Sequence, residues 1–191
     1  MSRPLLLLPL LALVACAVED APSPTAPVGD RADGEETPAA RPLGQADEAR
    51  VDLQPVGRGG VSGSVRLVGY DEGTRIVLRA EGLAPGLHGV AVLDATDCAD
   101  ADDAVHFDPA GAPHGDPEDP RPLHHAGDLG NVRATDDGAR LDRVFTDLRL
   151  DGPASVVGRV LAVHAGQDDL NTQPDGGAGA PVACGVIQPA E

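Results

Sequence analysis

Short runs in which apolar and polar residues alternate fill most of the chain after residue 50. The alternation is clear at 61–67 (VSGSVRL) and at 75–79 (RIVLR), as it is in β-strands that have one face in water. Glycine, proline and aspartate separate the runs, and the pattern predicts eight short strands at 50–55, 61–69, 73–83, 87–94, 131–135, 139–150, 155–165 and 184–188. An all-β fold follows, built as an antiparallel sandwich or barrel.

Two long polar segments, 94–130 and 164–183, interrupt this pattern. Loops longer than ~15 residues in a compact domain are usually functional. Five of the six histidines lie in or beside these two loops: His106, His114, His124, His125 and His164. We therefore expect the chemistry of the chain to lie in the loops.

Three of these histidines, together with one aspartate, have a spacing that suits a metal site. His114 follows His106 by eight residues, and Asp128 follows His125 by three. Three imidazoles and a carboxylate make a tetrahedral set of nitrogen and oxygen ligands that zinc accepts. The spacing alone is equally compatible with polar loop histidines that bind nothing.

The N-terminus, MSRPLLLLPLLALVAC, has one arginine, an apolar run at 5–14 and small residues before Cys16. The run is too short to span a membrane. The tetrapeptide LVAC resembles the lipobox of bacterial lipoproteins, in which the cysteine is lipidated and becomes the first residue of the mature chain. We expect a lipoprotein signal peptide at 1–15 and an acylated Cys16, with Ala17 favouring the outer membrane. An ordinary secretory signal cut nearby is the alternative, and both interpretations export the protein.

Residues 16–48 continue from this cysteine with five prolines, many acids and no periodicity, which predicts a disordered tether. The remaining residues, 49–191, form one predicted domain. Once Cys16 is lipidated, Cys98 and Cys184 remain as one pair. An oxidising compartment favours a disulfide between them.

The composition narrows the range of partners. The net charge is −17, from 31 acidic and 14 basic residues, and every basic residue is an arginine. Such a field repels nucleic acid and anionic lipid surfaces. We therefore expect no nucleic-acid partner, and membrane attachment through the lipid anchor only. Aromatic residues make up only 2% of the chain, so the core must be built from Val, Leu, Ile and Ala.

Several segments, in the same order along the chain, resemble the bacterial secreted form of the copper,zinc superoxide dismutase family. They are GLHG (86–89), HFDP (106–109), PHG (113–115), HAGDLGNV (125–132), VVGRVLAVHA (156–165), DDL (168–170) and GAGAPVACGVI (177–187). The resemblance runs from about Arg50 to Gln188 and implies a Greek-key, eight-stranded antiparallel β-barrel with two long functional loops. It also implies an intrasubunit disulfide between Cys98 and Cys184.

The resemblance assigns a zinc site and its surroundings. Four residues stand where the zinc ligands of the family are expected: His106, His114, His125 and Asp128. Asp168, in the DDL motif, resembles the carboxylate that hydrogen-bonds between the metal ligands and orients their imidazoles. His88, in the GLHG motif, is structural in the family, and His124 is an extra neighbour with no family role.

The copper site of the family is matched only in part. His106, which bridges both metals in the family, and His164 correspond to two of its four copper histidines. The other two positions hold Ala91 and Leu93. The alignment with the family needs no gap between GLHG and Cys98, so no shift of register places a histidine at either position. The active-site arginine of the family, three residues before the second cysteine, is replaced by Pro181.

We therefore expect a superoxide dismutase-like cell-envelope lipoprotein, facing the periplasm, that binds zinc structurally. Zinc has no accessible second oxidation state, so we expect little or no dismutase activity. Its role would be metal buffering, or that of a binding or structural module. The alternative is an active dismutase that converts superoxide to oxygen and hydrogen peroxide with copper at His106 and His164. A copper-delivery protein is less favoured, because Cu(I) carriers use Met and Cys ligands. Family members occur as monomers and as dimers, so a homodimer stays open.

Overall fold

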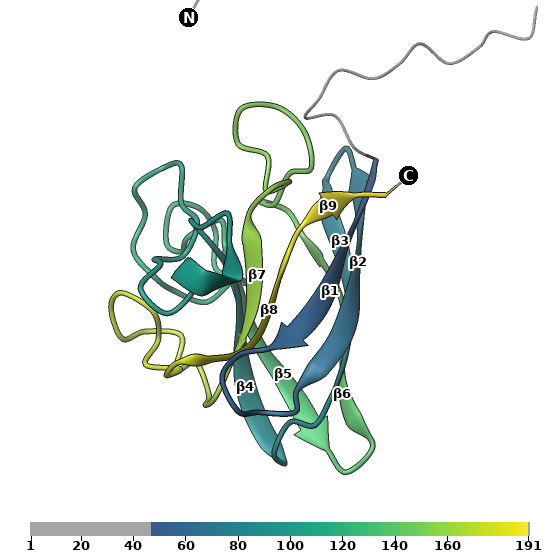
Figure 1. Cartoon of the computed structure of the whole chain (residues 1–191). Helices are drawn as coiled ribbons and strands as arrows, with labels where there is room; N and C mark the ends of the chain where they lie inside the picture. Colours follow the sequence, from purple (N-terminus) through teal and green to yellow (C-terminus); the bar gives the residue numbers. More distant parts are fainter. Residues whose placement is uncertain (1–46, 191) are drawn as a thin grey trace, which may run out of the picture. The chain divides into compact units, whose positions relative to one another are not determined.

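The computed structural model describes residues 47–190 (Figure 1). The predicted signal peptide, Cys16 and almost all of the predicted tether lie outside the described residues. The described part contains a 3-10 helix, η1 (Cys98–Asp100), and nine strands: β1 (Glu48–Pro55), β2 (Ser62–Tyr70), β3 (Gly73–Glu81), β4 (Gly86–Leu93), β5 (Asp128–Thr135), β6 (Gly138–Phe145), β7 (Val160–His164), β8 (Pro181–Val186) and β9 (Gln188–Pro189). Between residues 47 and 190 there is no helix that is long and apolar enough to cross a membrane.

The strands form one antiparallel sheet that closes on itself. Their order is β2-β3-β6-β5-β4-β7-β8-β1, and β1 pairs with β2 to complete the barrel, while the short β9 pairs with β1. Neighbours that are distant in sequence, such as β3 with β6 and β4 with β7, result from Greek-key crossovers. The all-β prediction and the closed eight-stranded barrel are confirmed.

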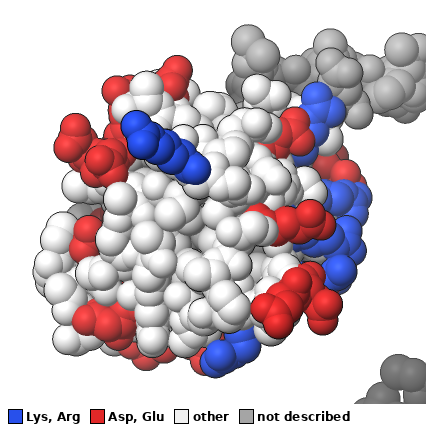
Figure 2. Space-filling view, turned by 60° about the horizontal axis from the view of Figure 1, so that its bottom comes forward, with Lys and Arg blue, Asp and Glu red and all other residues white. Residues whose placement is uncertain are grey.

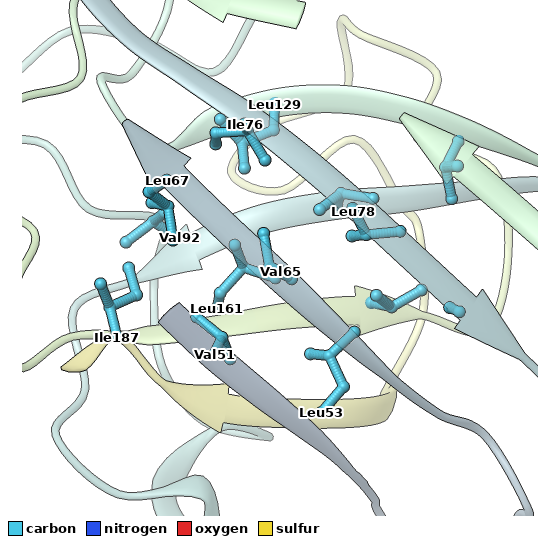
Figure 3. Packing of buried hydrophobic residues seen from close by; sticks show 14 of the residues in the cluster. Val51, Leu53, Val65, Leu67, Ile76, Leu78, Val92, Leu129, Leu161 and Ile187 are labelled. Carbon is cyan, nitrogen blue, oxygen red and sulfur yellow. The ribbon is translucent and has the colours of Figure 1, made fainter. Parts of the chain in front are cut away.

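The barrel interior is filled by branched aliphatic side chains, as the low aromatic content predicts. Alternate residues of β1, Ala49, Val51 and Leu53, are buried while those between them face out. Figure 3 shows Leu53, Leu67 and Leu161 pointing inward from different strands. The two-residue period of the sequence therefore results from one face packing in this core.

Two of the predicted strands are too long. The predicted strand 139–150 ends at Phe145, and the predicted strand 155–165 begins only at Val160. The apolar pattern continues through Leu148 and Val156, which are fully buried, but they belong to a connecting loop that packs against the barrel. Periodicity alone does not distinguish such buried loop residues from strand residues.

Strand β4 is buried on both faces, unlike the other long strands. Val90 and Val92 face the barrel core, while Ala91 and Leu93 belong to a second, smaller apolar cluster. That cluster is completed by Ala95, Ala101, Val160, Ala162 and Cys184. The loop after β4 therefore covers the outer face of the strand.

The predicted disulfide between Cys98 and Cys184 is present. It joins η1, in the first long loop, to β8 across 86 residues of sequence. On the chain-entropy estimate a loop of this length gives about 4.6 kcal/mol of stabilisation. The first long loop is thus attached covalently to the barrel that it covers.

Candidate metal site

The first long loop returns to β4 before β5 begins, and this return builds the site. His106 pairs with Leu93 in an isolated antiparallel bridge, and the Val92 N–H donates to the carbonyl oxygen of Gly127 at 2.9 Å. A Cβ atom at Gly127 would overlap the carbonyl oxygen of Val92, so the approach requires glycine. Asp128, the next residue, begins β5 and is brought close to His106.

Four predicted ligand residues meet at this point: His106, His114, His125 and Asp128. Each offers one ligand atom, and all four atoms lie within 4.8 Å of one another. The Nδ1 atoms of His106, His114 and His125 lie 2.6, 3.0 and 3.1 Å from Oδ1 of Asp128. Three imidazole nitrogens thus converge on a single carboxylate oxygen. We call these four residues the His/Asp cluster.

The carboxylate of Asp128 is held by the backbone. Its second oxygen, Oδ2, accepts hydrogen bonds from the backbone N–H groups of Gly115 at 3.0 Å and His125 at 2.8 Å. Burial favours the neutral acid, but hydrogen bonds to the three imidazoles outweigh it and lower the pKa of Asp128 below its ordinary value. The cluster therefore contains an ionised carboxylate at neutral pH.

Asp168 lies behind the cluster, in the second long loop. Its Oδ1 is 2.9 Å from Nε2 of His114 and accepts a hydrogen bond from the Leu170 N–H at 2.7 Å. The resemblance predicts that this carboxylate connects two metal ligands, yet among residues 47–190 His114 is the only cluster member that it hydrogen-bonds. Asp168 therefore orients one imidazole.

The charge state of His114 depends on these two carboxylates. Burial alone would lower its pKa, but hydrogen bonds to Asp128 and Asp168 raise the pKa from the ordinary 6.5 to about 10. Without a metal, His114 is therefore an imidazolium near neutral pH. A metal ion that binds its Nδ1 must displace a proton.

Three residues that sequence reasoning missed hold the second loop against the cluster. Asn131 and Asp168 exchange side-chain and backbone hydrogen bonds of 2.8 and 2.9 Å. The Gln173 amide accepts from the His114 N–H at 2.9 Å and donates to the His114 carbonyl at 2.8 Å. A Cβ at Gly176 would overlap Oδ1 of Asp168 and lie 2.7 Å from Nε2 of His114. Asn131, Gln173 and Gly176 form no motif of characteristic spacing, so the sequence alone does not mark them.

The Nε2 atom of His106 faces a different environment. Nε2 of His106 and Nε2 of His164 are both buried, and neither has a hydrogen-bond partner within the described part of the chain. The two ring centroids are 6.1 Å apart. His164 is held by a 2.7 Å contact between its Nδ1 and the Gly179 carbonyl, and burial lowers its pKa and keeps it neutral.

Apolar residues of β4 lie beside the chain segments that carry these two nitrogens. Leu93 is the bridge partner of His106, and Ala91 pairs with Ala162, which precedes His164 by two residues on β7. Ala91 and Leu93 are each 1% exposed. We call the region of His106 Nε2, His164 Nε2, Ala91 and Leu93 the Nε2 side.

The remaining predicted site residues lie outside both groups. The ring nitrogens of His88 contact the carbonyl oxygens of His164 and Ala84, each at 2.9 Å, which joins β4 to the end of β7 and to the turn that precedes β4. His124 is buried next to the cluster, with Nε2 at 3.2 Å from the Asp147 carboxylate but without hydrogen-bond geometry. Pro181 begins β8, a strand position that proline tolerates.

Two kinds of donor set can be distinguished here. The His/Asp cluster offers three imidazole nitrogens and one carboxylate oxygen in a tight group, which fits a divalent metal ion. The Nε2 side offers two imidazole nitrogens, and Ala91 and Leu93 in it carry no donor atom. The described residues thus provide one fully equipped metal site and one poor one.

The family comparison agrees with this architecture. The model of the family described as copper/zinc superoxide dismutase (SODC) matches residues 61–187. The match includes every strand from β2 to β8 and both long loops. It covers more than half of the chain, and the closed eight-stranded barrel is consistent with the fold of that family. The chain therefore belongs to the copper/zinc superoxide dismutase family.

Proposed function

We propose that this protein is a zinc-binding, lipid-anchored member of the family with little or no dismutase activity. The observation that carries the proposal is the contrast between the two nitrogens of His106. Its Nδ1 lies in a complete set of donors, whereas its Nε2 is buried without a hydrogen-bond partner within residues 47–190, and the neighbouring strand β4 carries Ala91 and Leu93.

Zinc is the metal that suits the His/Asp cluster best. It favours tetrahedral sites of imidazole nitrogen and carboxylate oxygen, and the family typically binds both copper and zinc. His106, His114, His125 and Asp128 would hold the ion. When bound, zinc supplies structural order and no redox step. The cluster residues come from the first long loop and β5, so the ion would fasten that loop to the barrel.

The Nε2 side does not fit the four-histidine copper site that the resemblance implies. Ala91 and Leu93 have no donor atom, and Cys98 and Cys184 are consumed in the disulfide. Within residues 47–190 there is no methionine to replace them. Dismutation needs a centre that accepts an electron from one superoxide and returns it to the next, and these side chains provide none.

The surroundings of the site also give little attraction for superoxide. The second long loop, 165–183, contains three aspartates and no basic residue. Pro181 stands where the resemblance places the arginine that would hold the anion. Anionic substrates are drawn into clefts by positive potential. The second long loop of this protein provides no such positive potential.

Export and lipid anchoring at Cys16 complete the proposal. The disulfide between Cys98 and Cys184 supports an oxidising compartment, because cytosolic thiols are kept reduced. The N-terminal sequence supports a bacterial outer-membrane lipoprotein facing the periplasm. There the protein would buffer zinc or act as a stable binding or structural module.

A second candidate is an active dismutase with an atypical copper site. The observation that favours it is the pair of buried, unpartnered nitrogens on His106 and His164. Copper heads the affinity order for nitrogen donors, so two imidazoles could retain Cu(II) weakly. This candidate predicts dismutation that is lost in a His164→Ala variant.

A superoxide assay on protein supplied with both metals and then desalted tests the proposal. We expect no dismutation above the buffer rate for the native chain. A double variant, Ala91→His with Leu93→His, restores the two missing donors and should retain more copper than the native chain. Dismutation by the native protein that depends on His164 would overturn the proposal in favour of the second candidate.

A further inference from the structure

Five exposed arginines gather on the outer surface of four neighbouring strands, β1, β2, β3 and β6. We call this surface the arginine face, and it consists of Arg50, Arg66, Arg75, Arg79 and Arg140. In the strand register, Arg50 lies directly opposite Arg66, and Arg79 lies directly opposite Arg140. Figure 2 shows basic side chains interspersed with acidic ones along the right edge of the molecule, and a further basic side chain at its upper left. Arginines are thus denser on these four strands than the net charge of −17 suggests.

The arginine face is only partly neutralised. Glu48 pairs with Arg66, and Asp142 pairs with Arg75 at 2.7 Å. Among residues 47–190, no carboxylate forms an ion pair with the other three arginines of the face: Arg50, Arg79 and Arg140. Like charges directly opposite in a sheet are destabilising. The face thus maintains a repulsion that a bound anion would relieve.

The shape of the face also suits an anion. A shallow hollow of about 510 Å³ lies on it. Its basic lining residues are Arg50, Arg66 and Arg79, which outnumber the acidic ones, Glu48 and Asp52, by one. Guanidinium groups bind phosphate through two parallel hydrogen bonds, and their stems cover apolar surface. The hollow therefore offers the guanidinium groups of Arg50 and Arg79 on the outer wall of the barrel.

The arginine face lies near the start of β1 and away from the two long loops. The tether proposed to carry the lipid anchor enters the barrel at Glu48, which begins β1 and pairs with Arg66 of the face. In the closed strand order, β4 and β7 lie four places from β2 and β3, on the opposite side of the barrel. Figure 1 shows the two long loops on the left and β1, β2 and β3 on the right. The arginine face and the two long loops therefore lie on different sides of the barrel.

The acidity of the rest of the domain does not prevent this contact. At physiological ionic strength the Debye length is about 8 Å, so charges on the far side of the barrel are largely screened from the membrane. Each arginine near an anionic bilayer is attracted to it. The net charge of the whole chain predicts repulsion from anionic lipid. The interaction with a membrane is nevertheless determined by the face that lies nearest to it, which in this proposal is the arginine face.

We propose that the arginine face docks on the phosphate headgroups of an anionic membrane and orients the barrel with its metal loops away from the lipid. This inference uses the lipid anchor proposed above, which supplies the high local concentration of membrane. The anchor alone would leave the barrel free to rotate on its tether. Docking fixes one orientation.

The test couples the mature chain to vesicles and measures which side faces the lipid. In the chain from Cys16 onward, Cys98 and Cys184 are bonded to each other, so Cys16 is the free thiol and reacts with a maleimide lipid. The chain has no tryptophan, so Val144→Trp, opposite Arg75 on β6, and Val105→Trp, in the first long loop, each introduce a single donor. Energy transfer to a dansyl headgroup lipid reports the distance of each from the membrane.

We expect added phosphatidylglycerol to increase the energy transfer from the tryptophan at position 144 and to decrease the energy transfer from the tryptophan at position 105. Replacing Arg79 and Arg140 by Gln should lower the oriented fraction by roughly tenfold. The matched control, Arg58→Gln with Arg121→Gln, removes the same charge outside the face and should leave the orientation unchanged. Equal transfer from both positions, or an equal effect of both arginine pairs, would overturn the proposal. Chemical coupling makes the result independent of lipidation in the cell and of metal content.

Discussion

The Nδ1 and Nε2 sides of His106 differ in where their neighbours come from. Nδ1 meets residues of the first long loop and of β5, whereas the buried Nε2 has no hydrogen-bond partner within residues 47–190. The side chains of Ala91 and Leu93 pack in the small apolar cluster and supply no ligand atom to the His/Asp cluster. The two sides share one imidazole and little else.

Under the proposed function, this separation explains how one half of a two-metal site is lost while the other persists. Apolar residues at positions 91 and 93 extend the packing of Val160 and Ala162, and they leave Asp128 and its three imidazoles in place. A metal ion in the His/Asp cluster would order a long polar loop, so its loss should affect the fold. Four measurements test the independence of the two sides.

The largest effect is expected from His125→Ala, which removes one ligand of the His/Asp cluster. Zinc at a thousandfold excess over its dissociation constant stabilises a folded protein by about 4 kcal/mol, and most of this should be lost. The measurement is the melting temperature with zinc and with EDTA. The control is His124→Ala, which removes the neighbouring buried histidine but no ligand atom. Equal zinc dependence in both variants would contradict the account.

A smaller effect is expected at Gly176, which lies against the outer side of the cluster. Gly176→Ala places a Cβ on Asp168 and His114, and loss of such an orienting carboxylate costs about 10- to 100-fold in metal affinity. Gly177→Ala is the matched control, because Gly177 has φ +62° beside +68° for Gly176 but no atom within 4 Å of its Cβ position. Both variants carry the same backbone strain. Zinc titrations that give equal affinities would show that Asp168 does not support the site.

The third effect is a pH dependence of zinc binding. His114 has a pKa raised to about 10 in the metal-free protein, so zinc must release its proton at neutral pH. Apparent affinity should fall by up to about tenfold for each unit of decreasing pH below that value. The same raised pKa stabilises the metal-free fold fully below pH 6.5, and this contribution is lost as pH rises through about 10.

Calorimetry in buffers of different ionisation enthalpy measures this proton release. A zinc-binding enthalpy that is independent of the buffer near neutral pH would contradict the assigned charge of His114.

The smallest effect is expected on the Nε2 side. His164→Ala removes the contact to the Gly179 carbonyl, which should cost about 1 kcal/mol of stability. Zinc affinity should stay unchanged, because Nε2 of His164 has no partner in the cluster. A marked loss of zinc affinity would show that the two sides of His106 are coupled.

The fold and the cluster residues were accessible from the sequence for different reasons. The two-residue period predicts eight strands because one face of each strand packs in a continuous core. The predicted strands are too long where buried loop residues such as Leu148 continue the apolar pattern. The cluster followed from histidine spacing together with motif resemblance. Asn131, Gln173 and Gly176 were missed, because their contacts join loops that are distant in sequence and no local pattern marks them.

Charge was the feature that the sequence described least well. Net charge sums over the whole chain, whereas the arginine face depends on which strands become neighbours in the barrel. The register that places Arg79 opposite Arg140 follows from a Greek-key crossover between β3 and β6. Composition carries no information about that pairing.

The metal content of the mature protein decides between one metal and two. The protein is produced in an oxidising periplasm with zinc and copper supplied, and its metals are measured by mass spectrometry after desalting. We expect about one zinc ion per chain and no copper, since the His/Asp cluster has four donors and the Nε2 side has two. Near-stoichiometric copper beside the zinc would contradict this expectation, and would show that His106 and His164 suffice for a second metal.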